Sequence, residues 1–343
     1  MSRESTGRPP ASPSEDPRLT PARKSVYASG DFALNTALSA MTMVYTTYFL
    51  TQVVGMRPVF VAAFVFIGRG VDAITDPAMG RITDLCRWKL GRRRPFFLIA
   101  AVPFGAVFAL LWIDLGTASQ WQMFAYYTGV YALLNLAMTA LSVPYLALQP
   151  EMALGYDART SLNTYRNAGS VLGIMAIGAL RPLAQALGGG PGGFAMAGAI
   201  FGALLALPWF PVFAVTWERP EFQQRATRLS LGKGLGMVAR HLAFRQLVGL
   251  YLCGRIAMDL LGAMLILYFT HFMGRTGDFE PTMMLSLVVV IASLPFWLRI
   301  ARQREKARIF IAGAAWWMCC MLTLLAAEPT WPAWSVLLLV CFG

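Results

Sequence analysis

Two carboxylic acids lie four residues apart in the segment GRGVDAITDPAMGRITD, at Asp72 and Asp76. Residues at this spacing share one face of a helix, and Arg69, three residues before Asp72, lies on roughly the same side. Two carboxylates near one arginine cannot all stay charged at low cost in a low-dielectric environment. The group could therefore bind a cation or take up a proton. Alternatively, Arg69 only pairs with Asp72 and holds the helices together, which leaves Asp76 unexplained.

Further oxygen atoms are available close to these acids. Thr75 offers a hydroxyl, and Pro77 removes a backbone donor and so exposes carbonyl oxygens in the same turn. Asp31 and Asn35 are also four residues apart and could hydrogen-bond a polyol. Equally, Asp31 could be an ordinary acid near the cytoplasmic start of a helix.

Two more basic residues fall within or beside apolar segments. Arg166, near the start of one segment, could reach a substrate oxygen or extend its charged end to the membrane interface. Arg255 lies four residues before Asp259, which is the spacing of an ion pair within a helix.

The segments that carry these residues are long and apolar. Hydrophobic residues make up 57% of the 343-residue chain and charged residues only 13%, about half of the roughly 25% usual in soluble proteins. This composition excludes an ordinary soluble enzyme and predicts an all-α polytopic membrane protein. Apolar runs long enough to cross about 30 Å of hydrocarbon lie near residues 27–54, 58–82, 96–115, 122–148, 162–187, 194–215, 243–273, 282–300 and 309–326. A tenth run starts near Trp331 and is cut off at Gly343.

The basic residues predict orientation and domain limits. Most of the 29 Lys and Arg residues lie on one side of the spans, which places the N-terminus in the cytoplasm and argues against nucleic-acid binding. The longest and most charged connection separates two bundles. We predict a disordered cytoplasmic tail over residues 1–24, a six-helix bundle over 25–216, an inter-bundle loop over 217–242 and an incomplete C-terminal bundle over 243–343.

The two bundles resemble each other in sequence. GDFALN at 30–35 and GRIAMD at 254–259 share Gly, Ala and the placement of polar residues. Each bundle also has a proline about one turn before a basic hairpin. These matches predict repeated halves, an arrangement in which transporters place a site near the membrane midplane.

Longer motifs connect the chain to a known family. GRGVDAITDPAMGRITDLCRWKLGRRRPF resembles helix 2 and the following loop of the glycoside–pentoside–hexuronide:cation symporters, within the major facilitator superfamily. VPYLALQPEMALGYDARTSLNTYRNAGSVLG resembles their segment from helix 4 to helix 5, and GDFALN and YFLTQVVG resemble their first helix. The resemblance implies twelve helices and alternating access. The chain is about two and a half helices shorter, so we expect it to be C-terminally truncated.

The resemblance also implies a cation site. Na⁺, Li⁺ or H⁺ would bind at Asp72 and Asp76, and no other cofactor is expected. Thr139 falls where a threonine of helix 4 contributes to that site. With Thr75 close by, the predicted cation-binding residues are Asp72, Asp76, Thr139 and Thr75.

The family's sugar contacts fall on Asn35, Ser142 and Arg166, to which the spacing argument adds Asp31. Asn35 and Ser142 stand where the melibiose-transporting pattern has aspartates, and Leu146 stands where it has a tryptophan. The paired acids that hold a galactoside are therefore missing.

The hairpin GRITDLCRWKLGRRRPF resembles the wider superfamily's motif between helices 2 and 3. Asp84 and the basic cluster that includes Arg92 and Arg93 could dock against neighbouring helix ends and stabilise one state of the transporter. This predicts a gating element. Alternatively, the basic residues only set the orientation of the chain in the membrane, and both interpretations can hold.

Together these patterns predict a monomeric, cation-coupled symporter of the bacterial inner membrane, embedded in the lipid bilayer, with a sugar or glycoside as its solute. Five cysteines and two histidines without metal-ligand spacing, and no nucleophile–base arrangement, argue against an enzyme. Two alternatives are a lipid or amphiphile carrier on the same scaffold and a non-transporting truncated membrane protein.

Overall fold

The computed structural model describes residues 17–219 except 87 and 117, residues 240–267 and 306–323, and the shorter pieces 221, 236, 272, 274, 285, 288–290, 292–293, 295–297 and 299–300. Within these residues the regular secondary structure is helical and contains no strand, which confirms the predicted all-α class. The chain divides into two compact units, Met1–Ala226 and Thr227–Gly343. The division falls inside the segment predicted to connect two bundles.

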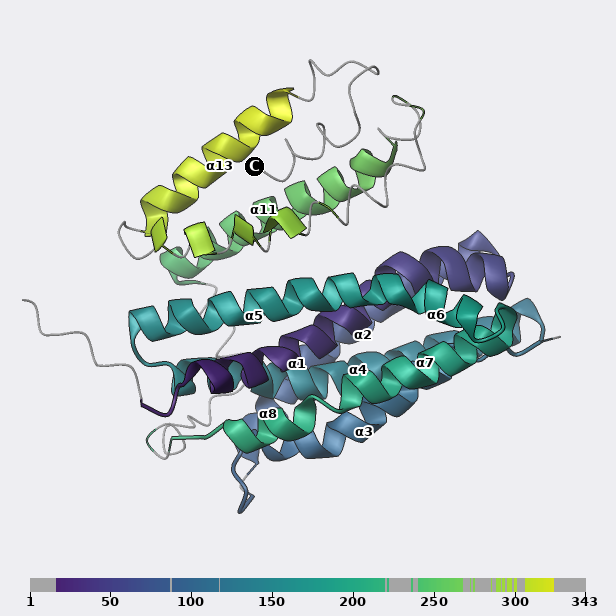
Figure 1. Ribbon diagram of the computed structural model, residues 1–343, viewed down its shortest axis with the longest axis horizontal. Helices are drawn as coiled ribbons and strands as arrows, with labels where there is room; N and C mark the ends of the chain where they lie inside the picture. Colours follow the sequence, from purple (N-terminus) through teal and green to yellow (C-terminus); the bar gives the residue numbers. More distant parts are fainter. Residues whose placement is uncertain are drawn as a thin grey trace, which may run out of the picture. The chain divides into compact units, whose positions relative to one another are not determined.

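The first unit contains most of the described helices (Figure 1). Its elements are α1 (Pro21–Ser39), the π-helix η1 (Ala40–Val53), α2 (Pro58–Leu85), α3 (Pro95–Leu110), α4 (Gln120–Met152), α5 (Tyr156–Ala176), the 3₁₀-helix η2 (Ile177–Ala179), α6 (Leu180–Ala186), α7 (Gly190–Ala206) and α8 (Trp209–Val215). In the second unit the structure describes α11 (Leu242–Leu267) and α13 (Lys306–Thr323).

Four described helical stretches are long and apolar enough to cross a membrane: Pro58–Leu85, Gln120–Met152, Tyr156–Ala186 and Gly190–Val215. They overlap the predicted runs 58–82, 122–148, 162–187 and 194–215. The run 27–54 forms α1 and η1, and the run 96–115 forms the shorter α3. The runs 243–273 and 309–326 overlap α11 and α13, whereas the run 282–300 is described only in part and residues beyond 323 lie outside the description.

Helix α1 begins earlier than the hydropathy pattern predicts. The Thr20 hydroxyl accepts from the backbone N–H of Arg23 at 3.4 Å, and Pro21 occupies the first turn, where its missing N–H costs nothing. Residues 21–24 are therefore helical, and the predicted disordered tail over 1–24 is wrong for its last four residues. Lys24 is buried, and its Nζ donates to Ser161 Oγ of α5 at 3.0 Å.

The early start changes the position of two predicted site residues. Asp31 lies ten residues into α1, about 15 Å along the axis at 1.5 Å per residue. Arg166 likewise lies ten residues into α5, which begins at Tyr156. Asp31 is thus not a helix-start acid, and Arg166 is not at a helix end. Both corrections have one cause: polar first turns extend these helices beyond their apolar runs.

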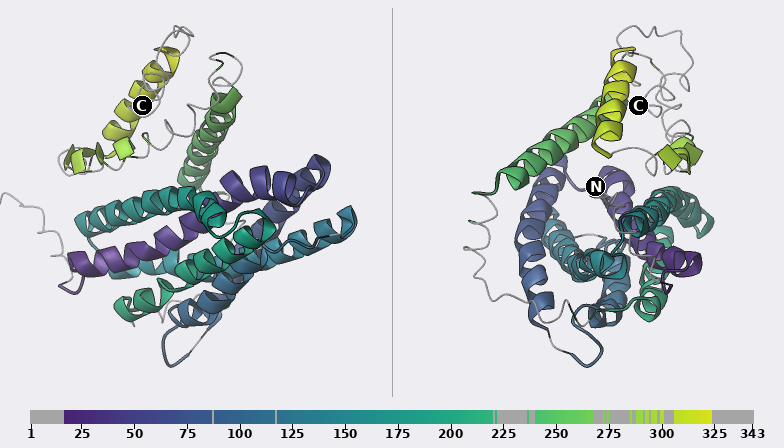
Figure 2. Two further views of the ribbon diagram at one scale, coloured as in Figure 1. Left: turned by 45° about the vertical axis from the view of Figure 1, so that its right-hand side comes forward. Right: turned by 90° about the vertical axis from the view of Figure 1, so that its left-hand side faces the viewer.

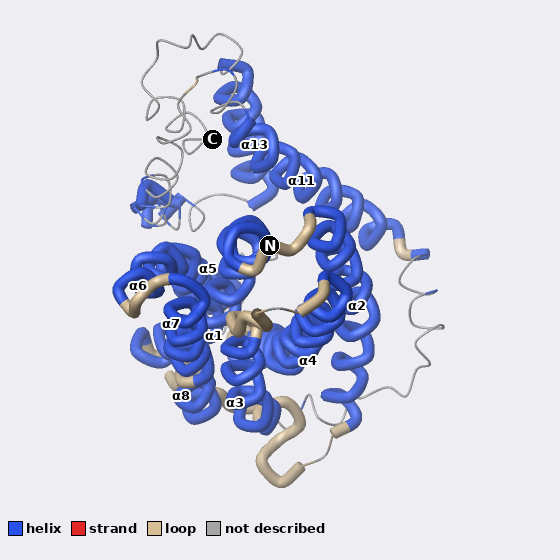
Figure 3. Tube along the Cα trace, turned by 90° about the vertical axis from the view of Figure 1, so that its right-hand side faces the viewer, coloured by secondary structure: helices blue, strands red, loops and turns tan. Residues whose placement is uncertain are grey.

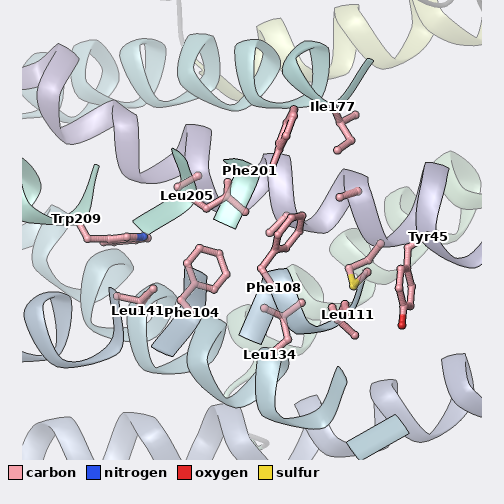
Figure 4. Close-up of a cluster of buried hydrophobic side chains, with 14 of the residues drawn as sticks. Tyr45, Phe104, Phe108, Leu111, Leu134, Leu141, Ile177, Phe201, Leu205 and Trp209 are labelled. Atoms are coloured by element: carbon pink, nitrogen blue, oxygen red, sulfur yellow. The ribbon is translucent and has the colours of Figure 1, made fainter. Parts of the chain in front are cut away.

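The first unit is assembled from pairs of adjacent helices. Figures 2 and 3 show α1 beside α5, α2 beside α4 and α3 beside α7, and the two helices of each pair are in contact. A cluster of buried aromatic and aliphatic side chains fills the space between them, and part of it is drawn in Figure 4: Tyr45, Phe104, Phe108, Leu111, Leu134, Leu141, Ile177, Phe201, Leu205 and Trp209.

Two glycines on α5 set the distance to α1. A Cβ added at Gly169 would lie 2.3 Å from the carbonyl oxygen of Ala28, and one at Gly173 would lie 2.4 Å from that of Phe32. Both distances are below any that real Cβ atoms show, so only glycine allows this approach. The close contact places the polar side chains of α1 and α5 within hydrogen-bonding reach of one another.

We predict that Gly169→Ala destabilises the protein, because overpacking a tight contact costs about 1–3 kcal/mol. Gly129→Ala is the matched control: Gly129 is also inside a helix, and an added Cβ would meet nothing within 4 Å. There the higher helix propensity of alanine should stabilise by up to about 1 kcal/mol. Thermal unfolding of both purified variants in detergent should give shifts of opposite sign. A melting temperature of Gly169→Ala equal to or above that of the wild type would contradict the close-contact interpretation.

Candidate functional site

The first polar group lies between α1 and α5. Arg166 Nε donates to Asp31 Oδ2 at 2.6 Å, and its Nη2 donates to Asp31 Oδ1 at 2.9 Å. This two-point geometry matches a guanidinium to a carboxylate and is the strongest form of the ion pair. The side chains are only 8% (Asp31) and 14% (Arg166) exposed, so each charge requires the other.

Helix α4 completes the surroundings of this ion pair. The Tyr145 hydroxyl donates to Asp31 Oδ2 at 2.6 Å, and the Arg166 guanidinium lies 5.2 Å from the centre of the Tyr145 ring. Arg166 Nη1 donates to the amide oxygen of Gln149, whose own nitrogen donates to Asn163 Oδ1 at 2.5 Å. Three helices therefore fix the position of one guanidinium.

The other two predicted solute contacts lie on α1, which also carries Asp31, and on α4. Asn35 is half-buried, and its amide nitrogen donates to the Asp31 carbonyl oxygen at 2.9 Å and to Ser170 Oγ at 3.0 Å. Ser142 is half-buried on α4, and Leu146, one turn later, is exposed. The structure thus joins Asp31, Asn35 and Arg166 through the α1–α5 contact, while Ser142 lies on the same helix as Tyr145.

The second polar group lies between α2 and α4. The hydroxyl of Thr139, which is buried, donates to Asp76 Oδ1 at 2.8 Å. The Asp76 residue itself is exposed, and Asp72, one turn earlier on α2, is half-buried. The structure therefore places an acid of α2 beside the threonine of α4 that the sequence pairs with it.

Two further features adjoin this group. The Thr75 hydroxyl is buried and has no hydrogen-bond partner among the residues that the structure describes. Asn135, one turn before Thr139, is buried and donates from its side-chain nitrogen to the Gly68 carbonyl oxygen at 3.4 Å. The side chain of Arg69 lies outside the description, and so does that of Asp259, the predicted partner of Arg255.

The third group lies where α2 is connected to α3. Arg93 Nη1 donates to Glu151 Oε1 at 2.5 Å and to the Ala147 carbonyl oxygen at 2.7 Å, and its Nη2 lies 3.3 Å from Asp84 Oδ1. Arg92 Nη2 also contacts Glu151 Oε1, at 3.3 Å, and its Nη1 lies 3.8 Å from Asp84. The three predicted gating residues therefore meet at the end of α4.

Glu218, just after α8, holds the backbone of the same connection. Its carboxylate oxygens accept the backbone N–H groups of Arg92, Arg93 and Arg94 at 2.8, 2.7 and 3.1 Å. Bonds from backbone N–H to a carboxylate are charge-assisted and stronger than neutral ones. The hairpin is thus attached by its main chain to Glu218, and by its side chains to α4 and, through Arg94 and the Phe213 carbonyl oxygen, to α8.

Sequence reasoning missed the partners on α4 and after α8. Tyr145 and Gln149 contact Arg166, and Glu151 and Glu218 contact the arginines of the hairpin. Two acids in the sequence could have indicated such partners. Glu151 lies in QPEM at the end of a long apolar run, and Glu218 lies in WERPEF after the sixth run. An acid at such a place predicts a basic partner but does not say which one.

Helices that can cross a membrane, with ionisable groups paired between them, define an integral membrane protein of the transporter class. A family model described as MFS/sugar transport protein matches residues 26–343. The chain belongs to this family, which confirms the superfamily recognised from its motifs.

Three individual relatives share about a quarter of their aligned residues with this chain. An uncharacterized symporter of Synechocystis is 25% identical over 89% of this chain and 72% of its own length. The isoprimeverose transporter of Lactiplantibacillus pentosus is 27% identical over 63% of this chain and 46% of its own length. The sodium-dependent lysophosphatidylcholine symporter 1 of Gallus gallus is 24% identical over 86% of this chain and 62% of its own length. The chain thus spans from about half to about three quarters of the length of these relatives.

The contacts of Glu218 lead to a prediction about the hairpin. In Glu218→Gln the backbone N–H groups of residues 92–94 lose a charged acceptor, and charged hydrogen bonds contribute about 1.5–3 kcal/mol. We expect Cys86, which directly follows α2, to react with a maleimide roughly three- to tenfold faster in the purified variant, as quantified by peptide mass spectrometry. Glu221→Gln, an exposed acid three residues later, is the control and should leave the rate unchanged. Equal rates in all three proteins would show that Glu218 does not hold the hairpin.

Proposed function

We propose that this protein is a cation-coupled symporter, which uses a Na⁺ or H⁺ gradient to move a sugar or related small solute by alternating access. The observation that carries the proposal is the contact of Thr139 with Asp76, one helical turn from Asp72. Acids are expensive in membrane-spanning helices unless they are paired or used. Here Asp76 has the hydroxyl of Thr139 as a neighbour, and Asp72 lies one turn away on the same helix.

The chemistry of these side chains suits a small hard cation. Carboxylate and hydroxyl oxygens are the ligands that such ions take, and no nitrogen or sulfur ligand is needed. The orphan hydroxyl of Thr75 supplies another oxygen in the same turn of α2. We propose Asp72, Asp76, Thr75 and Thr139 as the site for Na⁺, Li⁺ or H⁺.

For the solute we propose the region of Asp31, Asn35, Ser142 and Arg166. A half-exposed amide, a hydroxyl and a guanidinium are suitable partners for the hydroxyl groups of a sugar. Cation binding would favour the state that accepts solute, and joint occupancy would permit the change of state. Coupling then follows from the difference in ligand affinity between the two states.

We further propose that the hairpin formed by Asp84, Arg92 and Arg93 is a gate on the cytoplasmic side. Its ion pairs with Glu151 attach the connection between α2 and α3 to the end of α4 and would stabilise one state of the transport cycle. The excess of basic residues on this side supports a cytoplasmic N-terminus in a bacterial inner membrane. A single copy of the chain contains the proposed cation site, solute site and gate, in keeping with a monomer.

A lipid or amphiphile carrier on the same scaffold is the second candidate. It is favoured by Asn35 and Ser142, which replace the acids of the galactoside-binding pattern, and by a relative named for sodium-dependent lysophosphatidylcholine symport. Uptake assays with sugars and with lysophospholipids separate the two candidates.

The cation assignment predicts the behaviour of three variants. Asp72→Asn and Asp76→Asn should each lose uphill uptake by more than about tenfold, because one charge of the site is removed. Thr139→Val removes only the hydroxyl and should weaken the apparent affinity for the cation by roughly three- to tenfold. Uptake into vesicles, with Na⁺ and pH gradients imposed separately, measures both effects.

Thr128→Val is the control for this series. Thr128 lies on the same helix as Thr139, and its buried hydroxyl has no hydrogen-bond partner among the described residues. Its loss should leave the cation dependence unchanged. If Asp72→Asn or Asp76→Asn kept full uphill uptake with unaltered Na⁺ and pH dependence, these acids would not be the coupling site.

A further inference from the structure

We propose that Asp31 makes the solute site selective for uncharged sugars over sugar acids, by neutralising Arg166 from inside the protein. This inference rests on the proposed function and names the class of solute that the same site accepts. It starts from the best-formed ion pair of the solute region, in which both oxygens of one carboxylate are used by one guanidinium.

Both oxygens of the Asp31 carboxylate are engaged. Oδ2 accepts from Arg166 Nε and from the Tyr145 hydroxyl, both at 2.6 Å, and Oδ1 accepts from Arg166 Nη2 at 2.9 Å. The residue is 6% exposed, so water supplies little further stabilisation of its charge. Asp31 therefore occupies the place beside Arg166 that the carboxylate of a sugar acid would need.

The other proposed solute contacts add no charge to this pair. Asn35 and Ser142 are neutral where acids stand in the galactoside-binding pattern, and Gln149, which accepts from Arg166 Nη1, is neutral too. One buried negative charge and one buried positive charge therefore cancel in this region. A sugar acid would bring an additional negative charge into it.

Binding a sugar acid would require one of two costly changes. Its carboxylate could displace Asp31 and leave that acid buried without its cation, or it could remain unpaired beside the intact ion pair. A neutral sugar requires neither change. Each terminal nitrogen of Arg166 carries two N–H groups and donates to one acceptor among the described residues, so donors are left for sugar hydroxyls while the charges stay paired.

The test compares uptake of matched pairs of aryl glycosides and aryl uronides, of gluco and galacto configuration, which differ only in a hydroxymethyl or carboxylate group. Wild-type vesicles should take up the neutral member at least tenfold faster. Asp31→Asn frees the positive charge of Arg166 and should shift the uptake ratio by tenfold or more towards the uronide. Asp114→Asn, an acid in the connection between α3 and α4, is the control and should leave the ratio unchanged.

A second variant keeps the test valid if Asp31→Asn is poorly folded or inactive. Asp31→Asn combined with Asn35→Asp moves the acid one turn along α1 and restores a neutral region, so the preference for the neutral sugar should return. Equal uptake of glycosides and uronides by the wild type would overturn the inference and leave symport intact. An unchanged ratio in a folded Asp31→Asn variant would do the same. Absence of cation-dependent uptake of every neutral sugar would instead overturn the proposed function itself.

Discussion

The structure of the first unit depends on pairing buried charges between helices that are otherwise apolar. An isolated ion in such surroundings is expensive, so Asp31 on α1 and Arg166 on α5 must meet. They can do so because Gly169 and Gly173 let the two helices approach to a distance that no larger residue allows. Packing and electrostatics thus support each other: the glycines bring the helices together, and the ion pair sets their register.

Helix α4 connects the three polar groups. Within thirteen residues it supplies Thr139 to Asp76 of α2, Tyr145 and Gln149 to the Asp31–Arg166 pair, and Glu151 to the arginines of the hairpin. A helix that contacts the proposed cation site, solute site and gate cannot shift without changing all three sets of contacts. This is the physical basis on which ion binding could bias solute binding and closure, since coupling requires an element whose contacts differ between two states.

Much of the outline could be predicted from the chain because its signals are local. Asp72 and Asp76 share a face through their spacing alone, and apolar runs locate the helices to within several residues. The errors came at polar helix starts. Thr20 and Pro21 cap α1 six residues before its apolar run, so Asp31 lies well inside the helix. Arg166 lies inside α5 because the polar residues from Tyr156 onwards are already helical. A hydropathy pattern does not detect a polar first turn, whereas capping residues mark where the helix begins.

The sequence by itself determined that this is an α-helical membrane protein of the sugar transport family. It also determined which acids lie at unusual positions in apolar segments and on which side of the spans the basic residues gather. These are properties of composition, spacing and motif. Only the tertiary structure decided the partners: Asp31 with Arg166, Thr139 with Asp76, and Glu151 and Glu218 with the hairpin. The physical reason is that such pairs join residues far apart in the chain, and their choice depends on where helix packing brings two backbones close enough for side chains to meet.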